Sequence, residues 1–305
     1  MHGAYASNMA VEECDLLFSI GTRFNDRITG KLHAFAPKAT IVHIDIDTSS
    51  ISRNIQVDIP IVADAKEAIE KLLEYVEPME KKESWVEQIE GWKEEHPLRM
   101  KPKGDQMQAQ AILETINEVF KEDDKIVVTD VGQHQMFTSQ YLEVNEKTRL
   151  YMSGGLGTMG YGVGAAIGAK YGRPDKTVIN IAGDGCFRMN LNEIATAARY
   201  NVPIIQVVLN NHVLGMVRQW QTLFYDHRYS NTVLDDSVDF VKVAEGLGAM
   251  GIRANTLDEF EAAMKTALTA GRPVVIDVTI AGDDKVWPMV APGAAIDTCF
   301  SEDDM

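Results

Sequence analysis

One acidic residue stands between two glycines at the end of an apolar run, in the stretch TVINIAGDGC (177–186). Asp184 is followed 27 residues later by Asn211, which closes a second apolar run, PIIQVVLNN (203–211). The carboxyl ends of parallel strands share one edge of a sheet, where ligands collect. A carboxylate and an amide oxygen there suit Mg²⁺, which completes its octahedron with phosphate oxygens and water. The pair therefore predicts a magnesium site that bridges to phosphate.

A second interpretation is open for the same aspartate. The segment GLGTMG (155–160) matches the G-x-G-x-x-G dinucleotide fingerprint, and Asp184 lies 24 residues after Gly160, where a ribose partner would lie. A third interpretation is that Asn210 and Asn211 only shape a strand-to-helix turn. GDG and NN occur together at this distance, which favours the interpretation that Asp184 and Asn211 bind a metal.

Two local features add to the metal interpretation. We expect Gly183 and Gly185 to permit tight turns with positive φ, which bring backbone N–H groups close to a ligand. Asn190 and Glu193 have the spacing of a capping box, so we expect a helix that begins near Leu191 and presents its N-terminus to an anion.

Strands and helices that alternate along the chain must position these residues, which predicts an α/β fold with a mainly parallel sheet. We expect a first domain over residues 1–78, a Lys/Glu/Pro-rich linker over 79–104, a second domain with the predicted magnesium site over 105–285 and a tail over 286–305. The expected strands span 14–21, 40–47, 125–130, 148–152, 177–182, 203–209 and 272–280. The expected helices span 64–76, 106–119, 160–171, 191–200, 238–248 and 257–268.

Composition narrows the class of protein. The 305 residues carry a net charge of −16, which argues against nucleic acid and membrane surfaces as partners. The uncharged segment 151–169 contains seven glycines, so we interpret it as a packed turn and helix and not as a membrane span. The three scattered cysteines lack metal or disulfide spacing, and we expect a cytoplasmic protein. We interpret Cys186 as a buried packing residue.

Longer segments carry a resemblance to a known family. GDG through NN at this distance is similar to the thiamine-diphosphate motif. With its surroundings it resembles the large, catalytic subunits of the acetolactate (acetohydroxyacid) synthase family, in order along nearly the whole chain. The segments that carry the resemblance are DVGQHQM (130–136), SGGLGTMGYG (153–162), the run from Gly183 to Asn211, and GMVRQWQTLFYDHRYS (215–230).

The resemblance implies thiamine diphosphate and Mg²⁺ as cofactors. Asp184 and Asn211 match the side-chain ligands of Mg²⁺, and Val213 matches the position of a backbone carbonyl ligand. Gly157 and Met159 match the residues that support the aminopyrimidine ring. The other matched cofactor-binding residues are Gln133, His134, Gly183, Gly185, Gly215 and Met216.

The resemblance also implies that residues 1–78 are part of a Rossmann-like, FAD-binding middle domain and that 105–285 form the thiamine-diphosphate-binding domain. It further implies a substrate pocket. GTRFNDRITG (21–30) matches an arginine-rich element of the flavin-binding middle domain, with Asn25 in place of an aspartate. Arg23, Asp45 and Asp64 are the implied FAD contacts. Arg27 and Trp220 match residues of the substrate pocket.

The implied reaction joins pyruvate, with loss of CO₂, to a second 2-oxo acid, pyruvate or 2-oxobutyrate, in branched-chain amino acid biosynthesis. The implied assembly is a homodimer or tetramer with a possible small regulatory subunit. We assign no catalytic residue in this sequence, because the family's activating glutamate lies in an N-terminal pyrimidine-binding domain. We therefore expect an isolated C-terminal part with little or no activity. The alternatives are another thiamine-diphosphate carboligase or decarboxylase, a nicotinamide dehydrogenase, and a non-catalytic cofactor-binding fragment.

Overall fold

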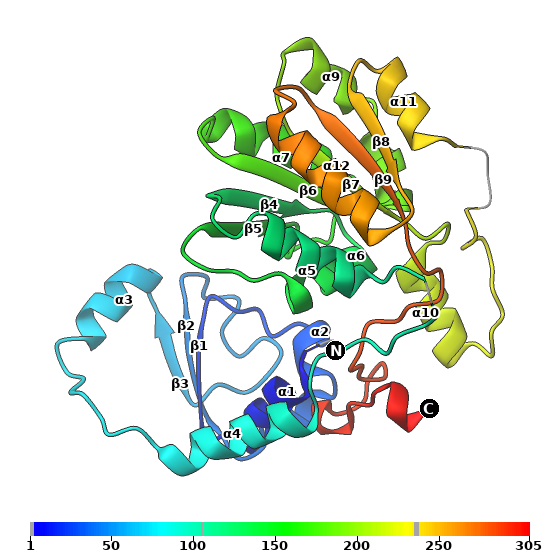
Figure 1. The fold of residues 1–305 in the computed structure, drawn as a ribbon. Coiled ribbons are helices and arrows are strands. Elements are labelled where there is room, and N and C mark those ends of the chain that lie inside the picture. Colours follow the sequence, from blue (N-terminus) through cyan, green and yellow to red (C-terminus); the bar gives the residue numbers. More distant parts are fainter. Residues whose placement is uncertain (1–2, 105, 235–237) are drawn as a thin grey trace. The chain divides into compact units, whose positions relative to one another are not determined.

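The computed structural model describes residues 3–104, 106–234 and 238–305. The chain forms two compact units (Figure 1). Unit 1 combines Met1–Leu98 with Trp287–Met305, and unit 2 comprises Arg99–Val286. Both units contain a parallel sheet with helices, so the predicted α/β fold is confirmed.

Unit 1 is built on a three-stranded parallel sheet in the order β1-β2-β3. Leu16 of β1 pairs with Thr40 of β2, and Val42 of β2 pairs with Ile59 of β3. One face is covered by a small core that includes Phe24, Phe35 and Ile296. The elements of unit 1 are α1 (Tyr5–Glu13), β1 (Leu16–Ile20), α2 (Asp26–Thr29), η1 (Leu32–Ala34), β2 (Thr40–Asp45), β3 (Ile59–Val62), α3 (Ala65–Leu72), α4 (Glu83–Glu95), η2 (Ile296–Thr298) and η3 (Glu302–Asp304).

The other face of β1 is apolar and open. Leu16, Phe18 and Ile20 alternate along the strand and are 54%, 46% and 41% exposed. Alternation places all three on one side of the sheet. Among the described residues, β1 is also an edge strand. Unit 1 therefore presents an apolar strip along β1 to solvent, whereas Val42 and Ile44, which pair with Phe18 and Ile20, are buried.

The segments expected as linker and tail are built into unit 1. The expected linker contains α4, which contacts α1, and His96 stacks on Tyr5 with ring centroids 3.7 Å apart. In the expected tail, the Ala294 carbonyl accepts a hydrogen bond of 2.9 Å from the Lys31 amide, and Ile296 is 3% exposed. The division between the compact units therefore falls after Leu98, because these contacts draw both segments into unit 1.

Unit 2 is built on a six-stranded, fully parallel sheet in the order β5-β4-β6-β7-β9-β8. Its strands are β4 (Lys125–Thr129), β5 (Thr148–Met152), β6 (Thr177–Gly183), β7 (Ile205–Asn210), β8 (Met250–Ala254) and β9 (Val274–Thr279). Its helices are α5 (Ala109–Val119), α6 (Gln133–Tyr141), α7 (Tyr161–Gly172), α8 (Asp184–Asn190), α9 (Glu193–Arg199), α10 (Gly215–Phe224), α11 (Phe240–Gly246) and α12 (Leu257–Thr269).

Helices cover both faces of this sheet, and α5 and α12 lie side by side on one of them (Figure 1). On that face α5, α6 and α12 pack on alternate strand residues such as Val127 and Ile181. On the opposite face α7, α8, α9 and α11 pack on the residues between them, such as Val128 and Ala182. Burial on both faces explains why β4, β6, β7 and β9 are mainly apolar. Single buried polar residues, Asn180, Gln206 and Asp277, interrupt β6, β7 and β9.

Every expected strand and helix is present, with shifted ends, but several elements were not predicted. Those absent from the prediction are α1, α2, β3, α6, α8, α10 and β8. Strand β3 contains Pro60 and strand β8 contains Gly251, which weaken the strand signal. Among the described residues, none of the helices combines the length and the apolar character that crossing a bilayer requires.

Candidate cofactor site

A cavity of about 260 Å³ lies in unit 2 where β4, β6 and β7 end. Its walls come from the turn after β4, the loop before α7, the start of α8 and the β7–α10 connection. The lining residues are Val131, Gly132, Gln133, His134, Phe137, Gly157, Met159, Gly183, Asp184, Gly185, Cys186, Leu209, Asn211, Val213, Leu214, Gly215, Met216, Val217 and Ile280.

The sequence-predicted residues for thiamine diphosphate and Mg²⁺ all line this cavity. Far apart in the chain, they meet because parallel strands deliver their carboxyl ends to one edge. The residues brought together are Gln133, His134, Gly157, Met159, Gly183, Asp184, Gly185, Asn211, Val213, Gly215 and Met216. Phe137, Leu209, Leu214 and Ile280 were not predicted; they add apolar surface and lie next to predicted residues or at the ends of predicted elements.

The glycines beside Asp184 serve close packing, and the expectation of positive φ was wrong. Gly183 has φ −77°, and Gly185 lies inside α8. A Cβ on Gly183 would lie 3.0 Å from Nδ1 of His134, and one on Gly185 would lie 2.5 Å from Cδ2 of Leu214. Both positions exclude side chains because neighbours occupy that space.

Asp184 is the first residue of α8, a helix that was not predicted and that precedes the one expected near Leu191. Helix α9 begins at Glu193 without a side-chain cap, and the Asn190 amide instead donates to the Gly160 carbonyl over 2.7 Å. The GDG turn therefore opens a helix directly. Negative charge at that first turn is favoured by the helix dipole.

The Asp184 carboxyl is 1% exposed, and its Oδ2 accepts no hydrogen bond from the described residues. Burial raises the pKa of Asp184 to about 6, partly offset by the backbone N–H of Gly185 and by nearby Arg188. A buried carboxylate oxygen that no protein donor satisfies fits a cation ligand.

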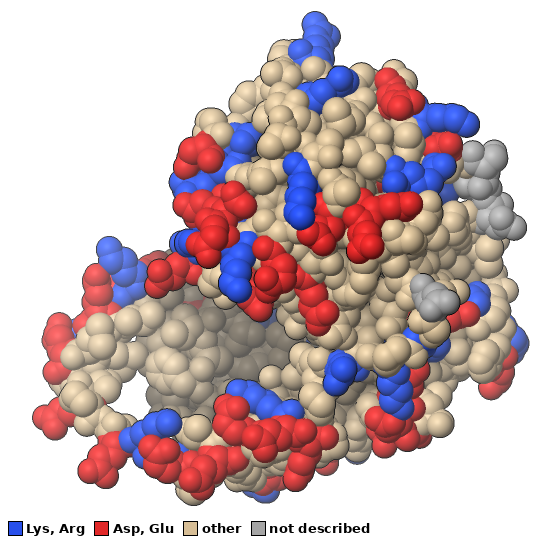
Figure 2. Space-filling view, in the orientation of Figure 1, with Lys and Arg blue, Asp and Glu red and all other residues tan. Residues whose placement is uncertain are grey.

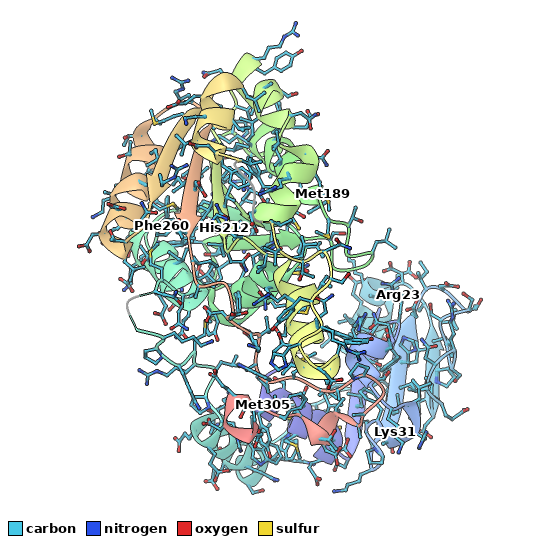
Figure 3. The ribbon with its side chains drawn as sticks, turned by 90° about the vertical axis from the view of Figure 1, so that its right-hand side faces the viewer. Arg23, Lys31, Met189, His212, Phe260 and Met305 are labelled. Carbon is cyan, nitrogen blue, oxygen red and sulfur yellow. The ribbon has the colours of Figure 1, made fainter. Side chains whose placement is uncertain are left out.

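The two asparagines at the end of β7 have different partners. Asn210 is buried, and its Nδ2 donates to Oδ1 of Asp277 in β9 over 3.0 Å. Asn211 lines the cavity, and its Oδ1 accepts from the Val213 amide over 3.2 Å. His212, which follows Asn211, adopts the left-handed conformation with φ 56° and lies on the connection between β7 and α10 (Figure 3). Asn210 thus fixes the strand end, and Asn211 is the one that faces the cavity.

Gln133 and His134 enter the cavity wall from the first turn of α6. The Gln133 Nε2 donates to Oε1 of Gln219 over 2.9 Å and to the Asp284 carbonyl over 2.8 Å. His134 is 6% exposed, and burial lowers its pKa to about 4. The imidazole is therefore neutral at neutral pH.

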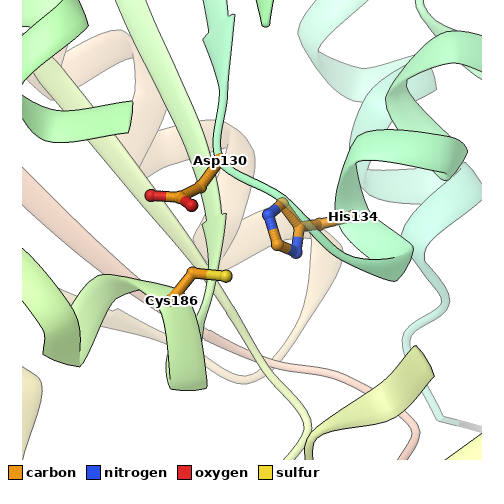
Figure 4. Close-up of side chains that lie close together, drawn as sticks. All are labelled: Asp130, His134 and Cys186. Atoms are coloured by element: carbon orange, nitrogen blue, oxygen red, sulfur yellow. The ribbon is translucent and has the colours of Figure 1, made fainter. Parts of the chain in front are cut away.

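Asp130, His134 and Cys186 form a buried cluster that resembles a metal site, with ligand atoms within 4.8 Å of one another (Figure 4). Two of the three groups already have partners. Asp130 accepts hydrogen bonds from the amides of Val131, Gly160 and Gly162, and the Cys186 thiol donates to the Val131 carbonyl. Burial raises the pKa of Cys186, which keeps the thiol protonated and agrees with its interpretation as a packing residue. We therefore interpret the roles of Asp130 and Cys186 as structural.

The loop before α7 contributes Gly157 and Met159 to the cavity. Gly157 has φ +62°, a conformation that favours glycine. The Met159 side chain is 39% exposed at the cavity wall. A flexible thioether side chain at such a wall can adapt to a ligand's shape.

Trp220 lies on α10, is half-buried and packs edge-to-face on Phe224 with ring centroids 5.6 Å apart. It does not line the cavity described above, but it follows Gly215 and Met216, which do. Its predicted partner Arg27 is an exposed residue of α2 in unit 1.

The residues predicted for FAD are at the carboxyl ends of the three strands of unit 1. Arg23 follows β1 and is exposed (Figure 3). Asp45 ends β2, and its Oδ1 accepts from the Asp47 amide over 2.8 Å. Asp64 follows β3 and caps α3, accepting from the amides of Lys66 and Glu67. The three thus share the sheet edge where nucleotides bind in such folds, although Asp64 also has a local structural role.

Two family models match the chain, one described as "Thiamine pyrophosphate enzyme, central domain" over residues 1–72 and the other as "Thiamine pyrophosphate enzyme, C-terminal TPP binding domain" over residues 130–278. The second match contains the GDG turn, the asparagine pair and nearly the whole cavity wall. The chain belongs to the thiamine pyrophosphate enzyme family.

Curated relatives within this family are about two-fifths identical to the chain over the aligned residues. Acetolactate synthase isozyme 3 large subunit of Escherichia coli is 40% identical, and acetolactate synthase large subunit of Corynebacterium glutamicum is 44% identical. Probable acetolactate synthase large subunit of Methanocaldococcus jannaschii is 42% identical. The matches cover 97% of this chain and 53%, 49% and 51% of the relatives, so the chain spans about half their length.

Membership in the thiamine pyrophosphate enzyme family confirms the predicted recognition and the predicted thiamine diphosphate. Mg²⁺ usually accompanies that cofactor, and FAD is known in acetolactate synthases. The dinucleotide interpretation of GLGTMG finds no support in this membership.

Proposed function

We propose that the chain is the C-terminal part of an acetolactate synthase large subunit. The reaction is the decarboxylating condensation of pyruvate with pyruvate or 2-oxobutyrate, in branched-chain amino acid biosynthesis. One observation carries the proposal: the segments after β4, β6 and β7 enclose a cavity with a buried carboxylate oxygen that no described protein donor satisfies. The similarity to acetolactate synthase large subunits supports the substrate class.

The residues of the cavity fit Mg²⁺ and a diphosphate. Asp184 and Asn211 offer side-chain oxygens and Val213 offers its carbonyl, and hard oxygen ligands are those that Mg²⁺ prefers. A Cβ on Gly215 would lie 2.0 Å from Oε1 of Gln133, so only glycine leaves room for the Gln133 side chain at this position of the wall. Gln133, His134, Gly183, Gly185 and Met216 complete the wall.

Thiamine diphosphate, when bound, supplies the carbanion and the electron sink that loss of CO₂ requires. Gly157 and Met159 would support its aminopyrimidine ring. Phe137, Leu209 and Ile280 exclude water from the cavity, and an apolar wall favours a step in which a carboxylate loses its charge. Trp220 and Arg27 would line the substrate pocket.

The activating glutamate of the family belongs to a pyrimidine-binding domain outside residues 1–305. We therefore propose that turnover requires that domain, supplied across a dimer interface. A homodimer or tetramer and a small regulatory subunit remain part of the proposal, supported by relatives named "large subunit". So does a cytoplasmic location, with which three free thiols agree.

We propose that unit 1 binds FAD through Arg23, Asp45 and Asp64. The support is their common position at the carboxyl edge of β1, β2 and β3. Titration of the chain with FAD, followed by flavin fluorescence, tests this part alone. Arg23→Ala should weaken binding, and unchanged affinity would remove Arg23 from the site.

The metal assignment is tested by Asp184→Ala. We expect the parent to bind thiamine diphosphate only with Mg²⁺, and the variant to lose this binding, as measured by calorimetry. Asp175→Ala is the matched control, because that carboxylate is 58% exposed and paired only on the surface. Equal affinity in Asp184→Ala and parent would overturn the assignment.

The activity is tested by adding a pyrimidine-binding domain from a related enzyme to the chain. With pyruvate, thiamine diphosphate and Mg²⁺, the mixture should form acetolactate. Cofactor binding without acetolactate, even with that domain present, would point to a non-catalytic chain. A different condensation product would point to another carboligase.

A further inference from the structure

The loop that carries Gly157 and Met159 has little apolar packing of its own. Leu156 is 88% exposed and Met159 is 39% exposed. Within the loop, the amides of Gly157 and Thr158 donate to the Ser153 carbonyl and hydroxyl. These bonds shape the turn but do not attach it to the sheet.

Asp130 provides one attachment. It is 0% exposed and follows the last residue of β4. Its Oδ1 accepts from the amide of Gly160 over 2.8 Å, and its Oδ2 accepts from the amide of Gly162 over 3.0 Å. The buried carboxylate thus binds the start of α7, where helix N–H groups lack partners within the helix.

Asn190 provides a second attachment on the other side of the same residue. Its Nδ2 donates to the Gly160 carbonyl over 2.7 Å. Gly160 has φ +88°, and a Cβ there would lie 2.9 Å from that Nδ2. Both polar groups of Gly160 are therefore held, its N–H by Asp130 and its C=O by Asn190.

Asn190 also ends the helix that begins with Asp184. The two ends of α8 therefore contact different parts of the cavity wall: the first residue offers the buried carboxylate, and the last residue holds the loop of Gly157 and Met159. One short rigid element consequently sets the spacing between them.

We propose that Asp130 and Asn190 are positioning residues that hold the Gly160 peptide, and through it Gly157 and Met159, against the aminopyrimidine ring of thiamine diphosphate. The inference rests on the proposed function for the identity of the ring. Its prediction is specific: loosening the loop should weaken contacts with the pyrimidine and leave contacts with the diphosphate unchanged.

The test compares Asn190→Ala with Asn192→Ala. Asn192 is the matched control, because its side chain donates only locally, to Glu193. Calorimetry measures the affinity for thiamine diphosphate and for inorganic pyrophosphate, both with Mg²⁺. Asn190→Ala should weaken thiamine diphosphate about three- to tenfold, as expected for one hydrogen bond, and change pyrophosphate less than about twofold. Asn192→Ala should change neither.

Hydrogen–deuterium exchange without any cofactor gives an independent readout. Peptides that cover 157–162 should exchange faster in Asn190→Ala than in the parent, and not in Asn192→Ala. Asp130→Asn should have a larger effect in the same peptides, because it loses an acceptor in a fully buried position. If Asp130→Asn does not fold, Asn190→Ala still decides the question.

Unchanged exchange over 157–162 in Asn190→Ala would overturn the attachment. Faster exchange with unchanged affinity for thiamine diphosphate would overturn the positioning role. Equal weakening of thiamine diphosphate and pyrophosphate would also overturn it, because that pattern indicates a general defect. If the parent binds pyrophosphate but not thiamine diphosphate, the proposed function fails, while the exchange result still tests the attachment.

Discussion

Two residues of the cavity wall, Asp184 and Asn211, come from the ends of neighbouring parallel strands. Asp184 and Asn211 follow apolar runs, so the sequence alone brings them to one sheet edge. The positioning roles of Asp130 and Asn190 were not predicted. Each side chain bonds to Gly160, 30 residues away in the chain, and the direction in which a side chain points cannot be read from the sequence. The role of the glycines beside Asp184 was missed for the same reason, since the neighbours that exclude a Cβ are distant in the chain.

The buried carboxyl of Asp184 makes the metal-free protein less stable at neutral pH. Burial raises its pKa to about 6, so the native state holds the proton more tightly than the unfolded chain does. Stability falls as pH rises from about 4 through 6, by up to about 3 kcal/mol. We expect Asp184→Asn to stabilise the metal-free chain by about 1–3 kcal/mol at pH 7. Urea unfolding in EDTA measures this, and equal midpoints would contradict it.

His134 responds to pH in the opposite direction. Burial lowers its pKa to about 4, so the native state resists protonation. Stability from this group is complete above about pH 6.5 and is lost as pH falls toward 4. The two effects oppose each other between pH 4 and 6.5. We therefore expect the stability of the parent to vary little in that range, and that of Asp184→Asn to decrease on acidification. Parallel pH profiles would contradict the assignment.

At the scale of elements, prediction worked where burial on both faces gives a strand a mainly apolar sequence, as in β6 and β7. It failed for α8, whose seven residues are too few for a periodic pattern. It also failed for α10, whose helical ends are not marked by a capping side chain. The conformation of such short elements is determined by the residues that pack against them, and these contacts cannot be read from the sequence.

Helix α7 contains a matched pair of glycines. A Cβ on Gly162 would lie 2.5 Å from Oδ1 of the buried Asn180, whereas Gly168 has open space around it. Gly162→Ala should lower the free energy of unfolding by about 1–3 kcal/mol through overpacking. Gly168→Ala should raise it by about 0.5–1 kcal/mol through helix propensity. Urea titration followed by circular dichroism measures both, and equal effects would contradict the packing argument.

Helix α10 is attached to the segment after β9 by Gln219. Its Oε1 accepts from the Val286 amide over 2.9 Å and its Nε2 donates to the Val286 carbonyl over 3.1 Å. Gln219 is 1% exposed. Gln219→Leu would leave the buried N–H and C=O of Val286 without these partners, and it should lower the free energy of unfolding by about 2–4 kcal/mol. Gln221→Leu should cost less, about 1 kcal/mol, because its contacts with Ser230 are exposed and the hydrogen bond that it accepts from the Thr232 hydroxyl is only part-buried. Equal losses in urea unfolding would refute this.

At the scale of the whole molecule, acidic side chains exceed basic ones, and both are interspersed over the face seen in Figure 2. A net charge of −16 repels a polyanion from the protein surface. A small ligand that is held inside a cavity by local contacts is compatible with this charge. The exposed face of β1 places three neighbouring apolar side chains on this surface. Sequence patterns predicted the strand but not which of its sides would be open.

That face should limit the solubility of the chain. Phe18 lies in the middle of an exposed, apolar edge strand, which is a template for association. Phe18→Lys should lower light scattering at high protein concentration and leave the melting temperature within about 2 °C, as for a surface substitution. Leu17→Lys is the matched control, because Leu17 packs against the unit 1 core and its substitution should unfold unit 1. Unchanged scattering in Phe18→Lys would contradict the prediction.

The return of residues 287–305 to unit 1 determines the order in which the chain can fold during synthesis. Unit 2 is one continuous segment, so it is complete once Val286 has left the ribosome. Unit 1 still lacks Ile296, a buried member of its core, until the segment that follows Val286 has been translated too. Domains generally fold in the order of synthesis, but here the unit that begins first must finish last. Premature termination near residue 290 would therefore release a chain with a finished cofactor cavity and an unfinished neighbour.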